Sequence, residues 1–131
     1  MYKRQLSGGV AQFNDDVGIG RDDATTLVTI SGGSFNVDGD LSFDILGGSG
    51  TIDFTDGSTG TLTVAGADAG TFEAFFDAGD ITFDGGAAGT FSELFQVNGS
   101  TLSVVTTAVP EPSSLALLGL GALGLMSRRS K

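Results

Sequence analysis

The chain has 131 residues, a formal net charge of −10, 22 glycines, and neither cysteine nor histidine. This length gives room for about one domain and a tail. The missing residue types exclude disulfides, thiolate sites, imidazole-bound zinc and serine–histidine catalysis. The excess of acid disfavours binding to nucleic acid and to anionic lipid headgroups.

An internal repeat with a shift of 24 residues begins near the N-terminus. The segment SGGVAQFNDDVGIG (7–20) aligns with SGGSFNVDGDLSFD (31–44). The same shift aligns apolar positions: Ala11 with Phe35, Phe13 with Val37, Val17 with Leu41, Ile19 with Phe43, Val28 with Ile52, and Ile30 with Phe54. A repeat of this length suits one turn of a solenoid, in which each turn stacks its apolar side chains on the next. We therefore expect three short strands in each turn.

A second repeat, with a shift of 19 residues, follows. LTVAGADAGTFEAFF (62–76) aligns with ITFDGGAAGTFSELF (81–95), and LSV (102–104) resembles a third copy that keeps the strand alone. Each full copy predicts one strand and then a helical turn. Strand, helix and strand over this length meet the minimum for a parallel crossover, which favours right-handed winding. Gly70 and Gly89 precede Thr-Phe in the two copies, so we expect both positions to exclude a β-branched side chain.

Phenylalanines recur at the repeat spacing in TFEAFF and TFSELF, which favours a core over a pair of partner-binding helices. The phenylalanines expected to point inward are Phe35, Phe43, Phe54, Phe72, Phe83 and Phe91. Phe76 and Phe95 recur at the same spacing and belong to the same expected core.

Two short motifs suggest hairpins. VNGS (97–100) contains Asn-Gly, a strong two-residue hairpin signal, so we expect the last strand to fold back as an antiparallel cap. VDGD (37–40) resembles it, and a meander over 27–45 would then follow. The fold prediction is mainly β: a right-handed parallel β-solenoid over 1–108 with short helical turns, followed by a C-terminal hydrophobic helix. An antiparallel β-sandwich is the alternative.

Aspartates in the predicted turns are the main candidates for metal ligands or catalytic groups in the body. GGSGTID (47–53) nearly matches a calcium-binding nonapeptide, but Asp53 falls one place late. We expect solvated turn carboxylates, with no metal and no cofactor, and keep specific calcium binding as the alternative. Paired carboxylates also hydrolyse glycosides. Beyond its first five residues the body holds only Arg21 as a cation, so we expect no catalytic residue and no enzyme.

Threonines line several predicted strands, at Thr29, Thr61, Thr63, Thr82 and Thr101. A flat outward row of these hydroxyls would indicate a carbohydrate- or ice-binding module on the same scaffold. The sequence leaves their direction open.

The tail begins with VPEP (109–112), continues with the uncharged run 113–126, and ends with SRRSK. As a helix the run is about 21 Å long, which is short for a bilayer core of about 30 Å. The terminal cations nevertheless fit the positive-inside tendency of membrane helices. GLGALG within the run has the glycine spacing of a dinucleotide-binding motif. The rest of that motif is missing, because few residues and no acid follow GLGALG. A buried C-terminal helix is the remaining alternative.

These three parts, in this order, resemble the PEP-CTERM sorting signal of exported bacterial proteins over residues 109–131. The resemblance implies recognition by a membrane peptidase, exosortase, and transient anchoring through helix 113–126. It assigns the sorting motif to Pro110, Glu111 and Pro112, and the cytoplasmic stop to Arg128 and Arg129. Such tails are also catalogued as ice-binding-protein C-terminal domains, a name that describes the tail alone.

The glycine-rich body loosely resembles the β-helical repeats of autotransporter passenger domains, which implies a cell-surface scaffold. The start, MYKRQ, is cationic but lacks the apolar stretch of a signal peptide, so we expect the chain to be the C-terminal part of a longer protein or to have a misassigned start. The predicted function is a non-enzymatic exported protein, first anchored in the membrane and then at the cell surface or in the extracellular matrix. Extracellular polysaccharide is a further candidate partner, and nucleic acid is not.

Overall fold

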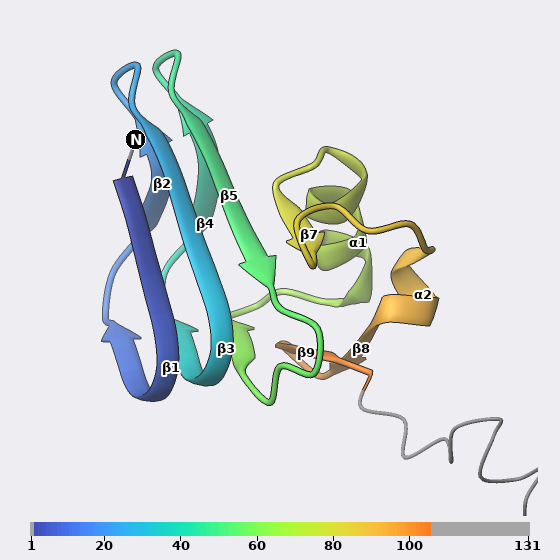
Figure 1. Ribbon diagram of the computed structural model, residues 1–131. Helices are drawn as coiled ribbons and strands as arrows, with labels where there is room; N and C mark the ends of the chain where they lie inside the picture. Colours follow the sequence, from blue (N-terminus) through green and yellow to red (C-terminus); the bar gives the residue numbers. More distant parts are fainter. Residues whose placement is uncertain (1, 106–131) are drawn as a thin grey trace, which may run out of the picture.

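The computed structural model describes residues 2–105, which form a mainly β body with two short helices (Figure 1). The strands are β1 (Tyr2–Phe13), β2 (Val17–Arg21), β3 (Thr25–Val37), β4 (Leu41–Ile45), β5 (Ser49–Phe54), β6 (Thr61–Val64), β7 (Ile81–Phe83), β8 (Phe95–Asn98) and β9 (Thr101–Val104). The helices are α1 (Ala69–Asp77) and α2 (Phe91–Leu94). The mainly β class predicted from the sequence is confirmed. The predicted hydrophobic helix 113–126 lies outside the described residues.

The 24-residue repeat is visible directly in the strand register. β1 pairs in parallel with β3 and β3 with β5, while β2 and β4 form a separate parallel pair. All six apolar alignments expected from the sequence are confirmed as strand neighbours: Ala11–Phe35, Phe13–Val37, Val17–Leu41, Ile19–Phe43, Val28–Ile52 and Ile30–Phe54. The repeat therefore brings like residues together across neighbouring strands.

The recurring Ser-Gly-Gly motif marks a bend within β1 and within β3. The register of β1 against β3 is irregular between Leu6 and Val10, and both second glycines of the motif, Gly9 and Gly33, have positive φ. A Cβ added to Gly33 would lie 2.6 Å from the Gly9 carbonyl oxygen. Only glycine allows both this backbone conformation and this close approach of the two bends. The bends curl the sheet, as Figure 1 shows at the foot of β1 and β3.

The third pass of the chain departs from the 24-residue pattern. β5 pairs in parallel with the first half of β3. A longer turn then precedes β6, which pairs with the second half of β3 and places Thr61 opposite Ser34. α1 follows and packs beside β4, with the rings of Phe43 and Phe75 5.0 Å apart. β7 then returns to pair in parallel with β5, with Ile81 opposite Ile52.

The 19-residue repeat is confirmed in its local structure and wrong in its stacking. Each copy forms a strand and then a helix, β6 with α1 and β7 with α2. β6 and β7 are not neighbours, however: β6 pairs with β3 and β9, and β7 pairs with β5. The reason is that α1 occupies the position beside β4, so the strand after it rejoins the other half of the curled sheet.

The expected antiparallel cap is confirmed. β8 and β9 form a hairpin with Asn98 opposite Thr101, and Gly99 has a φ of 63°. β9 also pairs antiparallel with β6, so the hairpin covers that edge. The antiparallel sandwich is wrong for residues 2–105, because five strand pairs are parallel and two antiparallel. VDGD (37–40) forms no hairpin, since β3 and β4 each pair with other strands.

The core lies inside the curl and thickens towards the helices. Alternating residues of β5 and β6 are buried, as a half-exposed sheet requires. Of the phenylalanines expected inside, Phe35, Phe54 and Phe72 are buried, whereas Phe43, Phe83 and Phe91 are half-buried. Buried Phe95 joins the last strands to the helices, with its ring 5.4 Å from that of Phe54 and 5.9 Å from that of Phe76.

Candidate functional site

The residues assigned to sorting, Pro110, Glu111, Pro112, Arg128 and Arg129, lie outside the described residues. The body ends just before them, in β9 and Val105. The Val105 amide donates a hydrogen bond of 2.9 Å to the Leu94 carbonyl, so the last described residue is fixed beside α2. The chain therefore leaves the body at the end that carries the helices.

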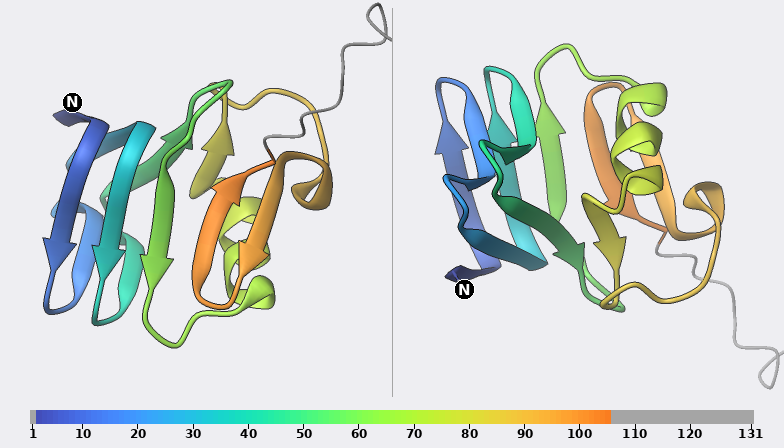
Figure 2. Two further views of the ribbon diagram at one scale, coloured as in Figure 1. Left: turned by 90° about the horizontal axis from the view of Figure 1, so that it is seen from below. Right: turned by 90° about the horizontal axis from the view of Figure 1, so that it is seen from above.

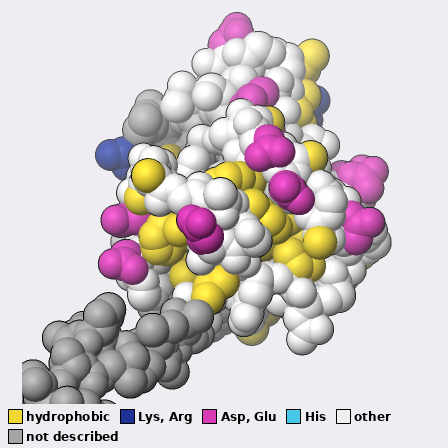
Figure 3. Space-filling model, turned by 90° about the vertical axis from the view of Figure 1, so that its right-hand side faces the viewer, with side chains coloured by type: hydrophobic (Ala, Val, Ile, Leu, Met, Phe, Trp, Pro, Cys, Tyr) yellow, Lys and Arg dark blue, Asp and Glu magenta, His cyan; other side chains and the backbone are white. Residues whose placement is uncertain are grey.

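A cavity of about 380 Å³ opens at this exit. Its lining combines apolar Phe83, Leu94 and Val104 with the carboxylates of Asp56 and Glu93. Figure 3 shows this side of the molecule, where apolar side chains lie exposed between acidic ones. Glu93 accepts a hydrogen bond of 3.2 Å from the Thr90 amide and so closes the first turn of α2. The Glu93 carboxylate therefore stabilises the start of α2.

Three of the aspartates, in a turn and on two strands, accept hydrogen bonds that fix the backbone or a neighbouring side chain. Asp16 accepts a hydrogen bond of 2.8 Å from the Asp40 amide, and Asp44 accepts one of 2.7 Å from the Gly50 amide. Asp53, weighed above as a calcium ligand, accepts from the Thr82 hydroxyl at 2.7 Å and from the Gly85 amide at 2.9 Å. Within residues 2–105 no three acidic side chains come together in a group that could hold a metal ion.

Two acids carry shifted pKa values, and both shifts have local structural causes. Burial raises the pKa of Asp80, and the nearby negative charge of Asp44 and a hydrogen bond with it raise it further. Hydrogen bonds from the backbone and side chain of Thr71 lower the pKa of Asp68, which is the N-cap of α1. Neither group lines the cavity at the chain exit.

An uncharged outer face forms where the second halves of β1 and β3 run beside β6, β9 and β8 (Figure 2, left). We call it the polar face; exposed Val10 lies at its edge opposite Ser34, and its polar residues are Gln12, Ser34, Asn36, Thr61, Thr63, Gln96, Asn98, Thr101 and Ser103. These side chains alternate along the strands with buried ones such as Leu62 and Leu102. The alternation places them on the outer surface of the curl.

Hydrogen bonds between side chains order the polar face. The Asn36 amide donates to the Gln12 side-chain oxygen at 3.2 Å, and the Thr61 hydroxyl donates to Ser34 at 3.3 Å. The hydroxyls of Thr63 and Thr101 lie 2.8 Å apart. The face thus presents regularly spaced hydroxyl and amide groups, which suits a neutral hydroxylated ligand.

The five threonines named from the sequence fall into two groups in the structure. Thr61, Thr63 and Thr101 lie together on the polar face. Thr29 and Thr82 lie in the other half of the curled sheet, each opposite Asp53. Sequence reasoning missed the partners Gln12 and Asn36, although the 24-residue shift places one opposite the other and would have found them.

The family model described as PEP-CTERM protein-sorting motif matches residues 108–130. The tail is therefore similar to the sorting motif of that family, and the match supports exosortase-dependent sorting of an exported protein. No curated protein and no solved structure matches the chain. Within residues 2–105, neither helix is long and apolar enough to span a bilayer.

Proposed function

We propose that the chain is a non-enzymatic exported protein that exosortase processes at its C-terminal signal, leaving the body at the cell surface or in the extracellular matrix. The observation that carries the proposal is the sorting motif at 108–130. In this account Pro110, Glu111 and Pro112 are recognised, helix 113–126 anchors the chain, and Arg128 and Arg129 stay on the cytoplasmic side. The precursor is first anchored in the membrane, and cleavage then releases the body.

The body in this proposal is a right-handed parallel β-solenoid that serves as a scaffold. Its support is the parallel pairing of β1, β3 and β5 at the 24-residue offset, repeated by β2 and β4 in the second sheet. Most of the acidic side chains are exposed, and several accept hydrogen bonds that fix the backbone of the scaffold. The position of Val105 beside α2 leaves the tail next to the capped end, where processing would not disturb the strand pairs.

Replacement of one glutamate tests the processing. In a host that carries exosortase, Glu111→Ala should leave the body attached to the membrane fraction. Glu73→Ala is the matched control, because it removes the same side chain from an exposed position of α1, away from the chain exit. Release of the Glu111→Ala body at the parental level would refute the assigned role of the motif.

A second candidate function is the binding of neutral carbohydrate, or of ice, through the polar face. The ordered hydroxyl and amide rows favour it, because such groups match regularly spaced hydroxyls or water positions. Retention of the protein on an insoluble neutral glucan, together with observation of ice-crystal growth, distinguishes the two ligands.

The double replacement Thr63→Val and Thr101→Val removes two hydroxyls while keeping β-branched side chains. It should weaken the binding several-fold, whereas Thr29→Val, in the other half of the sheet, should not. Equal loss in both variants, or no binding by the parent, would exclude this candidate.

A further inference from the structure

The outward side chains of the polar face form two rows that cross all five of its strands. The register of the strands places each member of a row beside the next. The first row is Gln12, Asn36, Thr63, Thr101 and Asn98, and the second is Val10, Ser34, Thr61, Ser103 and Gln96. Neighbouring strands lie about 4.8 Å apart, so each row extends about 19 Å across the sheet. The two rows are about 7 Å apart, because side chains on one face of a strand recur at every second residue.

Contacts inside each row hold its side chains in place. The first row contains the Asn36–Gln12 and Thr63–Thr101 contacts, and the second contains a third contact between two hydroxyls. Other hydrogen-bonding groups stay available, because an amide has two N–H donors and an oxygen, and a hydroxyl has two lone pairs besides its donor. A ligand therefore meets polar groups that are already ordered, which lowers the entropic cost of binding.

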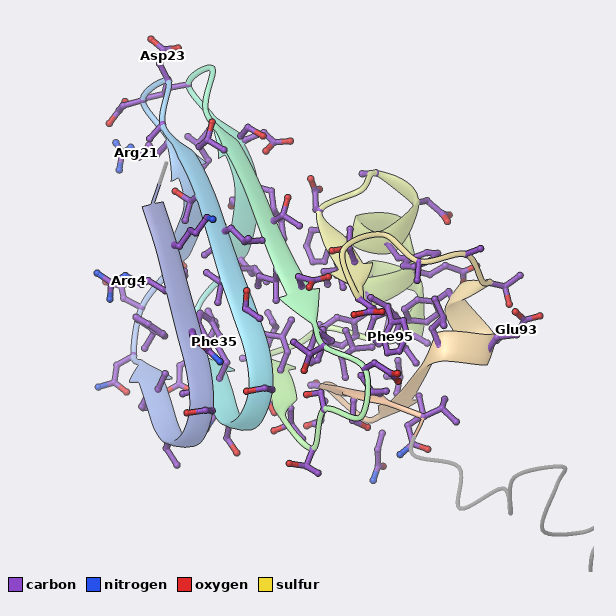
Figure 4. The ribbon with its side chains drawn as sticks, in the orientation of Figure 1. Arg4, Arg21, Asp23, Phe35, Glu93 and Phe95 are labelled. Carbon is purple, nitrogen blue, oxygen red and sulfur yellow. The ribbon has the colours of Figure 1, made fainter. Side chains whose placement is uncertain are left out.

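Both rows are uncharged, although the body is strongly acidic. Residues 2–105 hold every acid of the chain except Glu111. They hold only three cations, Lys3, Arg4 and Arg21, none of which belongs to either row. Figure 4 shows Arg21 at the end of the strands opposite the Ser-Gly-Gly bends. The surrounding acids repel anionic polymers, so the face suits a neutral ligand.

A hollow of about 150 Å³ borders the second row on the side of β8 and β9. Its lining includes Gln96 and Ser103 of that row, together with Thr59 and Gly60, which precede β6. A polymer whose repeating units carry protruding groups can place one of them in this hollow, whereas a planar ice surface would leave it unfilled. The hollow therefore favours a polysaccharide over ice.

We propose that the polar face binds an extended, neutral polysaccharide that runs across the strands, between the two rows. This binding mode rests on the second candidate function, carbohydrate binding by the polar face, and adds the shape and direction of the ligand. The sugars of an extended β-1,4-linked glucan repeat at nearly the spacing of neighbouring strands, about 4.8 Å. Each strand then meets one sugar, and hydroxyls on both edges of the ring reach a row.

A polymer fits this surface better than a single sugar does. One ring meets only the few groups of one strand and its neighbours, whereas linked sugars bind as one ligand, so that their contacts accumulate. Val10, which is 67% exposed at the β1 end of the second row, adds apolar surface for the C–H face of a ring. We therefore expect the affinity to rise with chain length up to about five sugars, one for each strand, and then to level off.

Calorimetric titration of the full chain in detergent micelles with cello-oligosaccharides tests this length dependence. Cellopentaose should bind at least tenfold more tightly than cellobiose, and cellohexaose should bind about as tightly as cellopentaose. Maltopentaose is the matched control ligand, because it contains the same sugars but its α-linkages curl the chain. It should bind at least tenfold more weakly than cellopentaose.

Two glutamines on opposite sides of the face test the direction of the ligand. Gln12 on β1 and Gln96 on β8 are both exposed, and three strands lie between them. Gln12→Ala and Gln96→Ala should each weaken the binding of cellopentaose several-fold, because only a chain that crosses the strands contacts both. Gln5→Ala is the matched control, since Gln5 is an exposed residue of β1 that lies opposite Thr29, outside the polar face. Circular dichroism checks that the variants remain folded.

Equal affinity for cellobiose and cellopentaose would overturn the extended binding mode and leave carbohydrate binding in place. Equal weakening by Gln5→Ala, or an effect of only one of the other two replacements, would overturn the direction across the strands. Failure to bind any of the oligosaccharides would overturn both the inference and the carbohydrate function, and shaping of ice crystals in that case would assign the face to ice. Exosortase processing is tested separately, because it uses the tail.

Discussion

Gly70 and Gly89 occupy equivalent positions in the 19-residue repeat but differ in backbone conformation. Gly70 lies in the first turn of α1, where an added Cβ meets only the Asp68 carboxylate, 3.5 Å away. Gly89 has a φ of 149°, and an added Cβ would lie 2.9 Å from Leu94. The backbone at Gly89 therefore supports the expectation that this position excludes a β-branched side chain, whereas the surroundings of Gly70 give it no support.

The first prediction compares alanine at these two glycines. Gly70→Ala should stabilise the body by about 0.5–1 kcal/mol, because alanine restricts the unfolded chain and favours a helix. Gly89→Ala should destabilise it by about 1–3 kcal/mol through backbone strain. Thermal unfolding of the two full-length variants measures the difference, and equal shifts would contradict this description of the 19-residue repeat.

The second prediction concerns Asp80, whose pKa burial and then Asp44 raise. A raised carboxyl pKa means that the folded state prefers the protonated form, so this group favours folding below its unfolded pKa and loses that contribution as pH rises through the folded pKa. Asp80→Asn should therefore raise the melting temperature at pH 7. The gain should shrink below about pH 4, the ordinary range of aspartate. A gain of the same size at both pH values would show that charge is not the cause.

At the scale of elements, the 24-residue repeat predicted which strands pair. Val28 opposite Ile52 and Val17 opposite Leu41 follow from the 24-residue shift alone. The 19-residue shift failed for a physical reason: similar local sequences form similar local structure, but the place of α1 beside β4 decides where the next strand goes. A short sequence repeat does not determine which distant strand the next strand pairs with.

The third prediction tests the core at the join between strands and helices. Phe54 is fully buried against Phe95, whereas Phe83 is half-buried. Phe54→Ala should cost about 3–5 kcal/mol, a large part of the stability of a small domain. Phe83→Ala should cost clearly less, because part of its ring already contacts water. Denaturant unfolding of both variants gives the two free energies, and a larger loss at Phe83 would contradict the assignment of the core.

At the scale of the whole molecule, the two candidate functional regions lie in separate places. The polar face runs along one outer side, and the chain leaves the body beside α2 at the capped end. The sequence predicted the sorting signal because that signal is contiguous. The polar face joins residues from five strands, so it became recognisable only once their register was known.

The central claim is that exosortase separates the body from its C-terminal anchor, and the mass of the released protein tests it most directly. Intact-mass spectrometry of protein from a host with exosortase should show a form that lacks the apolar run 113–126. The same host without the peptidase should retain the unprocessed chain in its membranes. Release of an identical shortened form from both hosts, or of the full-length chain from the first, would contradict the account.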